Sequence, residues 1–62
     1  GNATGSVIAG IVNTVVVGAT LEFYDENNVL LARYDNATDT TGHYNLAIDT
    51  TVLAKVKYIE PI

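Results

Sequence analysis

The sequence of 62 residues contains no cysteine, no methionine and no tryptophan. Without cysteine there is no disulfide, no thiolate metal ligand and no cysteine nucleophile. Basic residues are nearly as scarce, since Arg33, Lys55 and Lys57 stand against seven acidic residues. Nucleic-acid binding needs clustered Lys or Arg, so a net charge of −4 argues against that class of partner.

Long apolar runs are also missing. The most apolar stretch, residues 7–21, is interrupted by polar residues and glycines, and it is shorter than the roughly 20 apolar residues of a membrane-spanning helix. It also lacks the basic flank of a signal peptide. The sequence therefore predicts no transmembrane segment.

A chain of this size buries only a small core, which usually needs a disulfide, a metal or a neighbour as a supplement. Cysteine is absent and metal ligands are few. We therefore expect a single β-sandwich domain over residues 1–62, without a cofactor or a metal. Its core would be completed by copies of the chain or by adjoining domains of the same protein.

Residues that favour strands are abundant, because Val, Ile, Thr and Tyr supply 25 of the 62 positions. Apolar residues alternate along most of the chain, and polar turn signals separate the runs. This pattern predicts an all-β fold, a small antiparallel β-sandwich of roughly five to seven short strands. The clearest strands are expected over residues 6–12, 18–25, 29–35, 43–49 and 52–59.

The alternation also predicts which side chains face the interior. Tyr24, His43 and Asn45 fall on outer faces, and Lys55 and Lys57 lie opposite the apolar face of the last strand. The expected interior set is Ala19, Leu21, Phe23, Tyr34, Tyr44, Leu46, Ile48, Val52, Ala54, Val56 and Tyr58.

Four segments give the chain a family likeness. They are Gly5-Ser6-Val7, the stretch Gly18-Ala19-Thr20-Leu21-Glu22-Phe23, the stretch Ala37-Thr38-Asp39-Thr40-Thr41-Gly42-His43-Tyr44-Asn45-Leu46, and Val52-Leu53-Ala54-Lys55-Val56. With these segments the chain resembles the carboxypeptidase regulatory-like domain, a transthyretin-like and immunoglobulin-like β-sandwich. Domains of that family usually run longer and end with one more strand, and a missing strand leaves an open edge for a neighbouring subunit to complete.

The resemblance implies a non-catalytic module of a secreted or cell-surface protein, such as a stalk or spacer. Its most recognisable part is a turn motif formed by Asp39, Gly42 and Tyr44. The Asp39 carboxylate can accept hydrogen bonds from the backbone N–H groups that follow it. Gly42 is expected to supply a positive φ, and Tyr44 to point inward.

Two further kinds of chemistry need consideration. His43 follows Asp39 by four residues and could form half of a catalytic pair, with Ser6 the only serine. An oxygen-rich calcium site could form if the two polar loops met at one end of the sandwich. Its candidate ligands are Asp25, Glu26, Asp35, Asn36 and Asp39. Solvated turn residues explain both sets without any ligand.

Surface chemistry suggests two other possibilities. Asn2-Ala3-Thr4 and Asn36-Ala37-Thr38 are N-glycosylation sequons, which favours an extracellular or cell-surface setting with glycans on Asn2 and Asn36. Tyr24 could stack on a sugar ring. A Lys–Asn isopeptide cross-link, as in a related sandwich family, is disfavoured because the lysines come late in the chain.

The segment from Ile8 to Val17 holds more apolar side chains than one strand face can bury. Left exposed, it would favour aggregation, so we expect a second chain to cover it. The predicted interface residues are Ile8, Ile11, Val12, Val15, Val16 and Val17. The leading interpretation is a self-associating structural module, at the extreme a filament or surface-assembly subunit. The alternative is an accessory domain that binds glycan or calcium.

Overall fold

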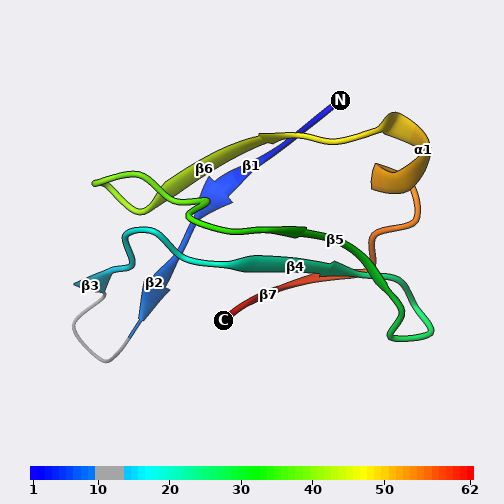
Figure 1. Ribbon diagram of the computed structural model, residues 1–62, viewed down its shortest axis with the longest axis horizontal. Coiled ribbons are helices and arrows are strands. Elements are labelled where there is room, and N and C mark those ends of the chain that lie inside the picture. The colour runs from blue at the N-terminus through cyan, green and yellow to red at the C-terminus, as the bar shows by residue number, and fades with distance from the viewer. Residues whose placement is uncertain (10–13) are drawn as a thin grey trace.

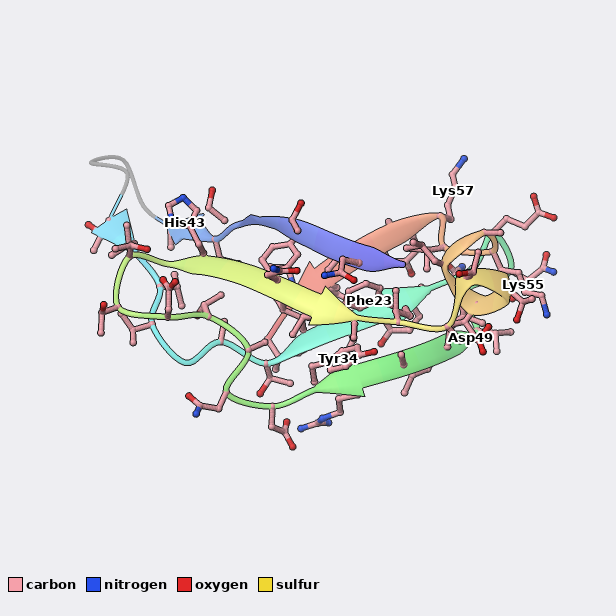
Figure 2. The ribbon with its side chains drawn as sticks, turned by 90° about the horizontal axis from the view of Figure 1, so that it is seen from above. Phe23, Tyr34, His43, Asp49, Lys55 and Lys57 are labelled. Carbon is pink, nitrogen blue, oxygen red and sulfur yellow. The ribbon has the colours of Figure 1, made fainter. Side chains whose placement is uncertain are left out.

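The computed structural model describes residues 1–9 and 14–62 and confirms an all-β fold. Its elements, in chain order, are β1 (Asn2–Ser6), β2 (Ile8–Ala9), β3 (Thr14–Val15), β4 (Leu21–Tyr24), β5 (Leu30–Tyr34), β6 (His43–Ala47), α1 (Thr50–Leu53) and β7 (Tyr58–Pro61). All strand pairs are antiparallel, in three groups ordered β1-β6, β2-β3 and β5-β4-β7. The β1-β6 pair forms one layer of a small sandwich and β5-β4-β7 the other (Figures 1 and 2).

The core lies between these two layers. Phe23 and Leu21 of β4 are completely buried, as the alternation of residues 18–25 predicts. Ala3, Val7, Ala19 and Ile48 are the other buried apolar residues in the described part of the chain. The Tyr34 ring meets the Phe23 ring edge-on at 5.6 Å between centroids (Figure 2). The core is therefore centred on β4, the middle strand of the larger sheet.

The predicted first strand over residues 6–12 is wrong in its position. β1 already starts at Asn2, and its pairing with β6 runs from Asn2↔Ala47 to Ser6↔His43. The chain then leaves β6, and Ile8 pairs with Val15 of β3 instead. Residues 2–6 are small or polar, so their pattern does not predict a strand. The segment is recognised as a strand only from its pairing with β6. Residues 10–12 of the prediction lie outside the described residues.

The predicted last strand over residues 52–59 is also wrong. Asp49 caps the single helical turn α1, and its carboxylate accepts a hydrogen bond of 2.8 Å from the Thr51 N–H. The cap competes with strand formation and takes Val52 into the helix, and β7 begins only at Tyr58. The expected strand face of Val52, Ala54, Val56 and Tyr58 does not form, and neither does the opposite face carrying Lys55 and Lys57. Val52 and Val56 still pack on the core, whereas Ala54 and Tyr58 are exposed.

Candidate functional site

The turn before β6 has the geometry that its sequence motif predicts. One Asp39 carboxylate oxygen accepts hydrogen bonds from the Thr41 N–H, the Thr41 hydroxyl and the His43 N–H, at 2.8, 2.6 and 3.0 Å. The Thr41 hydroxyl bond, followed by the two backbone bonds, holds the pKa of Asp39 below its ordinary value. Gly42 has a φ of +80°, and its N–H donates to the Asp39 carbonyl. The motif therefore works as a turn that sets the start of β6.

Tyr44, the third residue of the motif, points inward as expected. Its ring lies over Gly5 of β1, so close that a Cβ on Gly5 would come within 2.6 Å of the Tyr44 hydroxyl oxygen. Gly5 and Tyr44 are register partners in the β1-β6 pair. The glycine therefore makes room for the ring, and the pair joins the two strands of this layer on their inner face.

The catalytic hypothesis gains little from this geometry. The His43 Nδ1 lies 2.7 Å from the Thr41 hydroxyl, which in turn contacts Asp39, so the ring reaches the carboxylate only through Thr41. Ser6 stands directly opposite His43 in the strand register, and both are exposed. Within the described part of the chain, no hydrogen bond joins Ser6 to His43. The cluster thus lacks the contact between nucleophile and base that acyl transfer requires.

The calcium hypothesis fails in its geometry. The turn at residues 25–28 lies at one end of the molecule and the loop at residues 36–42 lies at the other (Figure 1). Asp25 is used locally, since its carboxylate accepts from the N–H groups of Asn27 and Val29. Asp35 contacts Arg33 and Thr20. Over residues 1–9 and 14–62 no three acidic or histidine side chains gather in a way that could hold a metal ion.

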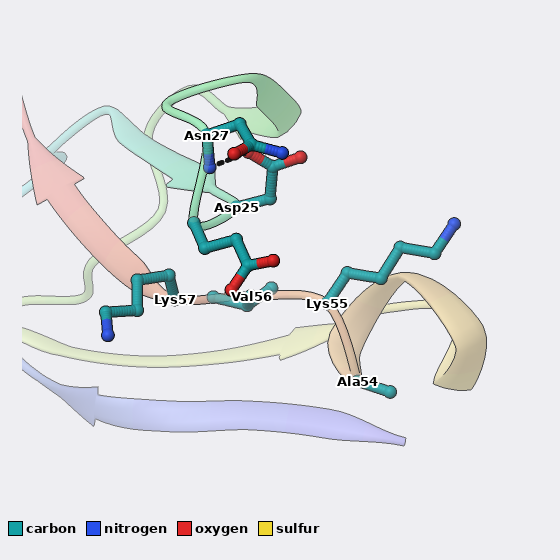
Figure 3. A pocket seen from close by; sticks show the side chains of 7 residues that line it. Asp25, Asn27, Ala54, Lys55, Val56 and Lys57 are labelled. Atoms are coloured by element: carbon teal, nitrogen blue, oxygen red, sulfur yellow. Dashed lines mark hydrogen bonds between the residues drawn. The ribbon is translucent and has the colours of Figure 1, made fainter.

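A shallow cleft of about 440 Å³ opens beside the turn at residues 25–28 (Figure 3). Asp25, Glu26 and Asn27 form one wall, and residues 54–57 between α1 and β7 form the other. Figure 3 shows the Lys55 and Lys57 side chains extending in different directions. Among the described residues the ion pairs are those of Arg33 with Glu22 and Asp35, so none bridges this cleft. The cleft offers no converging set of side chains.

Thr38 is the buried polar residue that sequence reasoning missed. It is 5% exposed, its hydroxyl donates to the Val16 carbonyl at 2.6 Å, and it accepts from the Ala19 N–H at 2.9 Å. The loop before β6 is thereby tied to the segment before β4. The sequence signal for this role is the threonine immediately before Asp39 in the turn motif. A threonine hydroxyl can donate to a buried carbonyl and accept from a buried N–H at the same time.

The two sequon asparagines both lie on the surface. Asn2 is on the outer face of β1, where its side chain donates to the Asn45 side chain at 2.8 Å. Asn36 follows β5 with a φ of +52°. Their accessibility is compatible with attached glycans.

The predicted interface residues divide into three groups. Val15 and Val17 are 43% and 58% exposed, which is high for valine. Val16, between them, points the other way and packs against the core. For Ile8 the backbone pairing with Val15 is described, and Ile11 and Val12 lie outside the described residues. Two apolar side chains thus stand exposed at the end of the sandwich that carries β2 and β3 (Figure 1).

Tyr58 is exposed on the outer face of the larger sheet, contrary to its predicted interior position. Its ring stacks on Tyr24 with centroids 5.1 Å apart and an angle of 14° between the ring planes. The Tyr24 hydroxyl donates to the Glu22 carboxylate at 2.7 Å, and this bond is the main cause that raises the pKa of Tyr24 to about 12. The Tyr58 hydroxyl donates to Asn28. Tyr24 therefore does have a second aromatic beside it.

No described helix has the length and apolar character needed to cross a membrane. Comparisons with protein-family models, with curated proteins and with solved structures found no match for this chain.

Proposed function

We propose that this chain is a non-catalytic structural module of a secreted or cell-surface protein, related to the carboxypeptidase regulatory-like domains, and that it self-associates. The observation that carries the proposal is the exposure of Val15 and Val17 on the end of the sandwich at β2 and β3. A second copy that covered this apolar end would remove both side chains from water. Burying one valine side chain is worth about 1.5 kcal/mol or more.

The small core supports the same proposal. Among the residues whose burial the structure describes, Phe23 and Leu21 are the fully buried large side chains, and domains of this size are marginally stable alone. Association would add apolar burial to a core that is short of it. The two exposed sequons support an extracellular setting, because such sites are glycosylated on secreted proteins.

Val17→Lys tests this proposal with little risk to the fold, since Val17 is more than half exposed. Val16→Lys is less useful as a test, because Val16 packs on the core and a charge there would destabilise the fold itself. Val29→Lys is the matched control, because Val29 is 53% exposed and belongs to the connection between β4 and β5, which lies at the other end of the molecule from β2 and β3 (Figure 1).

Light scattering after size exclusion gives the particle mass. We expect assemblies for the natural chain and for Val29→Lys. Val17→Lys should weaken association through this end of the sandwich by about tenfold or more and lower the particle mass. A natural chain that stays monomeric at high concentration would refute self-association. Unchanged assembly of Val17→Lys would show that the interface lies elsewhere.

A second candidate function is glycan binding, and the stacked Tyr24–Tyr58 pair favours it. Glu22 and Glu60 are register partners directly beside this pair, and Arg33 lies 3.5 Å from Glu22. Aromatic faces next to carboxylates and a guanidinium can receive a sugar ring and its hydroxyl groups. Titration with oligosaccharides should change the tyrosine fluorescence of the natural chain and of Val17→Ala, whose exposed side chain lies outside this sheet, but not that of Tyr58→Ala. No change with any of them would remove this candidate.

A further inference from the structure

The hydrogen-bond pattern of β1 shows which of its backbone groups point away from β6. The Ile48 N–H donates to the Gly1 carbonyl, and the Val7 N–H donates to the Gly42 carbonyl. Hydrogen-bonded positions alternate in an antiparallel ladder, so Ala3 and Gly5 also face β6. Asn2, Thr4 and Ser6 therefore direct their N–H and C=O groups outward. Among the described residues, none of these outward backbone groups has a hydrogen-bond partner.

The edge formed by β1 is also the least protected of the long strands. Figure 2 shows β1 at the border of its layer. Neither β1 nor β6 carries a charged Asp, Glu, Lys or Arg residue. Natural edge strands usually carry charges, prolines or bulges that block pairing with another chain, and β1 has none of these within residues 2–6.

Each of the other edges carries a feature that hinders pairing with another chain. β7 ends in Pro61, which has no N–H to donate. β5 carries Arg33 and a register irregularity opposite Phe23 and Tyr24. On β6 the outward groups of His43 are bonded to Asp39, and the Ala47 carbonyl accepts from the Tyr34 hydroxyl.

We propose that β1 pairs antiparallel with β1 of a second copy of this chain, about a two-fold axis at Thr4. In this register Thr4 faces Thr4 of the second copy, and Asn2 faces Ser6 of the second copy. All outward N–H and C=O groups of the three residues then find partners. The result is a continuous four-stranded sheet, ordered β6-β1-β1-β6. The proposal rests on the proposed self-association and identifies a contact separate from Val15 and Val17.

The register is also self-complementary on the outer face of this sheet. The side chains of Asn2, Thr4 and Ser6 are exposed and uncharged, so no like charges meet across the two-fold axis. A shift by two residues in either direction would leave an outward N–H and C=O without a partner. A shift by one residue would place the outward backbone groups of one copy opposite backbone groups of the other copy that point toward its own β6.

Disulfide cross-linking tests the register, since the natural chain has no cysteine. Across a hydrogen-bonded antiparallel pair the Cα atoms lie about 5.5 Å apart, within disulfide range. Thr4→Cys should therefore form a covalent dimer under mild oxidation. Asn45→Cys is the matched control, because Asn45 is the register partner of Thr4 on β6, one strand farther from the axis. A mixture of Asn2→Cys and Ser6→Cys should cross-link more than tenfold faster than either alone.

A second pair of variants tests the contribution of the backbone. Thr4→Pro removes the outward N–H and leaves the β1-β6 ladder intact, whereas Thr4→Val keeps the N–H. We expect Thr4→Pro to raise the dissociation constant about tenfold or more, and Thr4→Val to change it little. Circular dichroism would confirm that both variants fold.

The outcomes separate this inference from the proposed function. If the natural chain assembles and Val17→Lys prevents assembly, but Thr4→Cys does not cross-link faster than Asn45→Cys, the proposed function stands and the β1 contact is wrong. Unaltered association of folded Thr4→Pro would overturn the β1 contact as well. A natural chain that remains monomeric would refute both.

Discussion

Single residues in this protein hold the connections between strands. Thr38 is the clearest case, because its hydroxyl links the Val16 carbonyl to the Ala19 N–H. The bond from the Ala19 N–H is buried and the bond to the Val16 carbonyl is partly buried, so loss of the hydroxyl would leave the Ala19 N–H without a partner away from water. Buried groups left without a partner cost about 1–3 kcal/mol each.

Thr38→Val should therefore lower the free energy of unfolding by about 2 kcal/mol or more. Valine retains the shape of the threonine side chain, so the loss of stability measures the contribution of the hydrogen bonds. Thr38→Ser keeps the hydroxyl and should cost less. Denaturant titration measures both. Equal losses for the two variants would mean that the methyl group, and not the hydroxyl, holds the loop.

The carboxylates of Asp39 and Asp49 make the fold sensitive to acid. The Thr41 and Thr51 hydroxyls, followed by backbone N–H groups, lower the pKa of these residues from the ordinary value of 3.8. A lowered pKa in the folded state means that the unfolded state binds protons first as the pH falls. Both groups thus contribute stability above pH 3.8, which is lost as the pH falls through their lowered pKa values.

We expect the melting temperature of the natural chain to drop below about pH 4. The double variant Asp39→Asn, Asp49→Asn should melt at a lower temperature at neutral pH and show a shallower drop in acid. Glu26→Gln, on an exposed turn, should follow the natural chain. If the melting temperatures of the natural chain and the double variant fell in parallel as the pH decreased, this assignment would be wrong.

At the scale of elements, the loop between β5 and β6 needs unusual backbone at both ends. Asn36 has a φ of +52° and Gly42 a φ of +80°. A Cβ on Gly42 would also lie 2.9 Å from the Val15 Cβ and 3.0 Å from the Val7 carbonyl oxygen. At Gly18, with a φ of +69°, the nearest atom is the movable side-chain oxygen of Asn36.

Gly42→Asn should therefore destabilise the fold more than Gly18→Asn does. Asparagine tolerates positive φ, so the difference reports the contact with Val15 and Val7, and we expect about 2 kcal/mol. Thermal or denaturant unfolding of the two variants gives the comparison. Equal effects would show that β3 can move away from Gly42 at little cost.

At the scale of the whole molecule, two proposed contacts lie at different places on one chain. A two-fold contact through β1 closes into a dimer, whereas a second contact through Val15 and Val17 links one dimer to the next. Two such contacts per chain generate an open series unless their geometry closes a ring. This is how so small a module would build a filament or a surface assembly.

Salt should strengthen this assembly. Every copy carries a net charge of −4, while β1, Val15 and Val17 are uncharged. Between about 20 and 200 mM NaCl the repulsion between copies is increasingly screened. We expect the dissociation constant to fall several-fold, measured by sedimentation equilibrium. Weaker assembly in higher salt would mean that ion pairs hold the contact and that both proposed surfaces are misassigned.

The local pattern of the sequence was sufficient for the interior of β4, the hairpin to β5 and the turn before β6. Strict alternation places Leu21 and Phe23 inward, and Asp39 and Gly42 define their turn through bonds within a few residues. Only the tertiary structure decided the pairing of β1 with β6, the stacking of Tyr58 on Tyr24 and the burial of Thr38. Each depends on contacts between residues far apart in the chain. β1 also has too few apolar side chains for its sequence pattern to predict a strand.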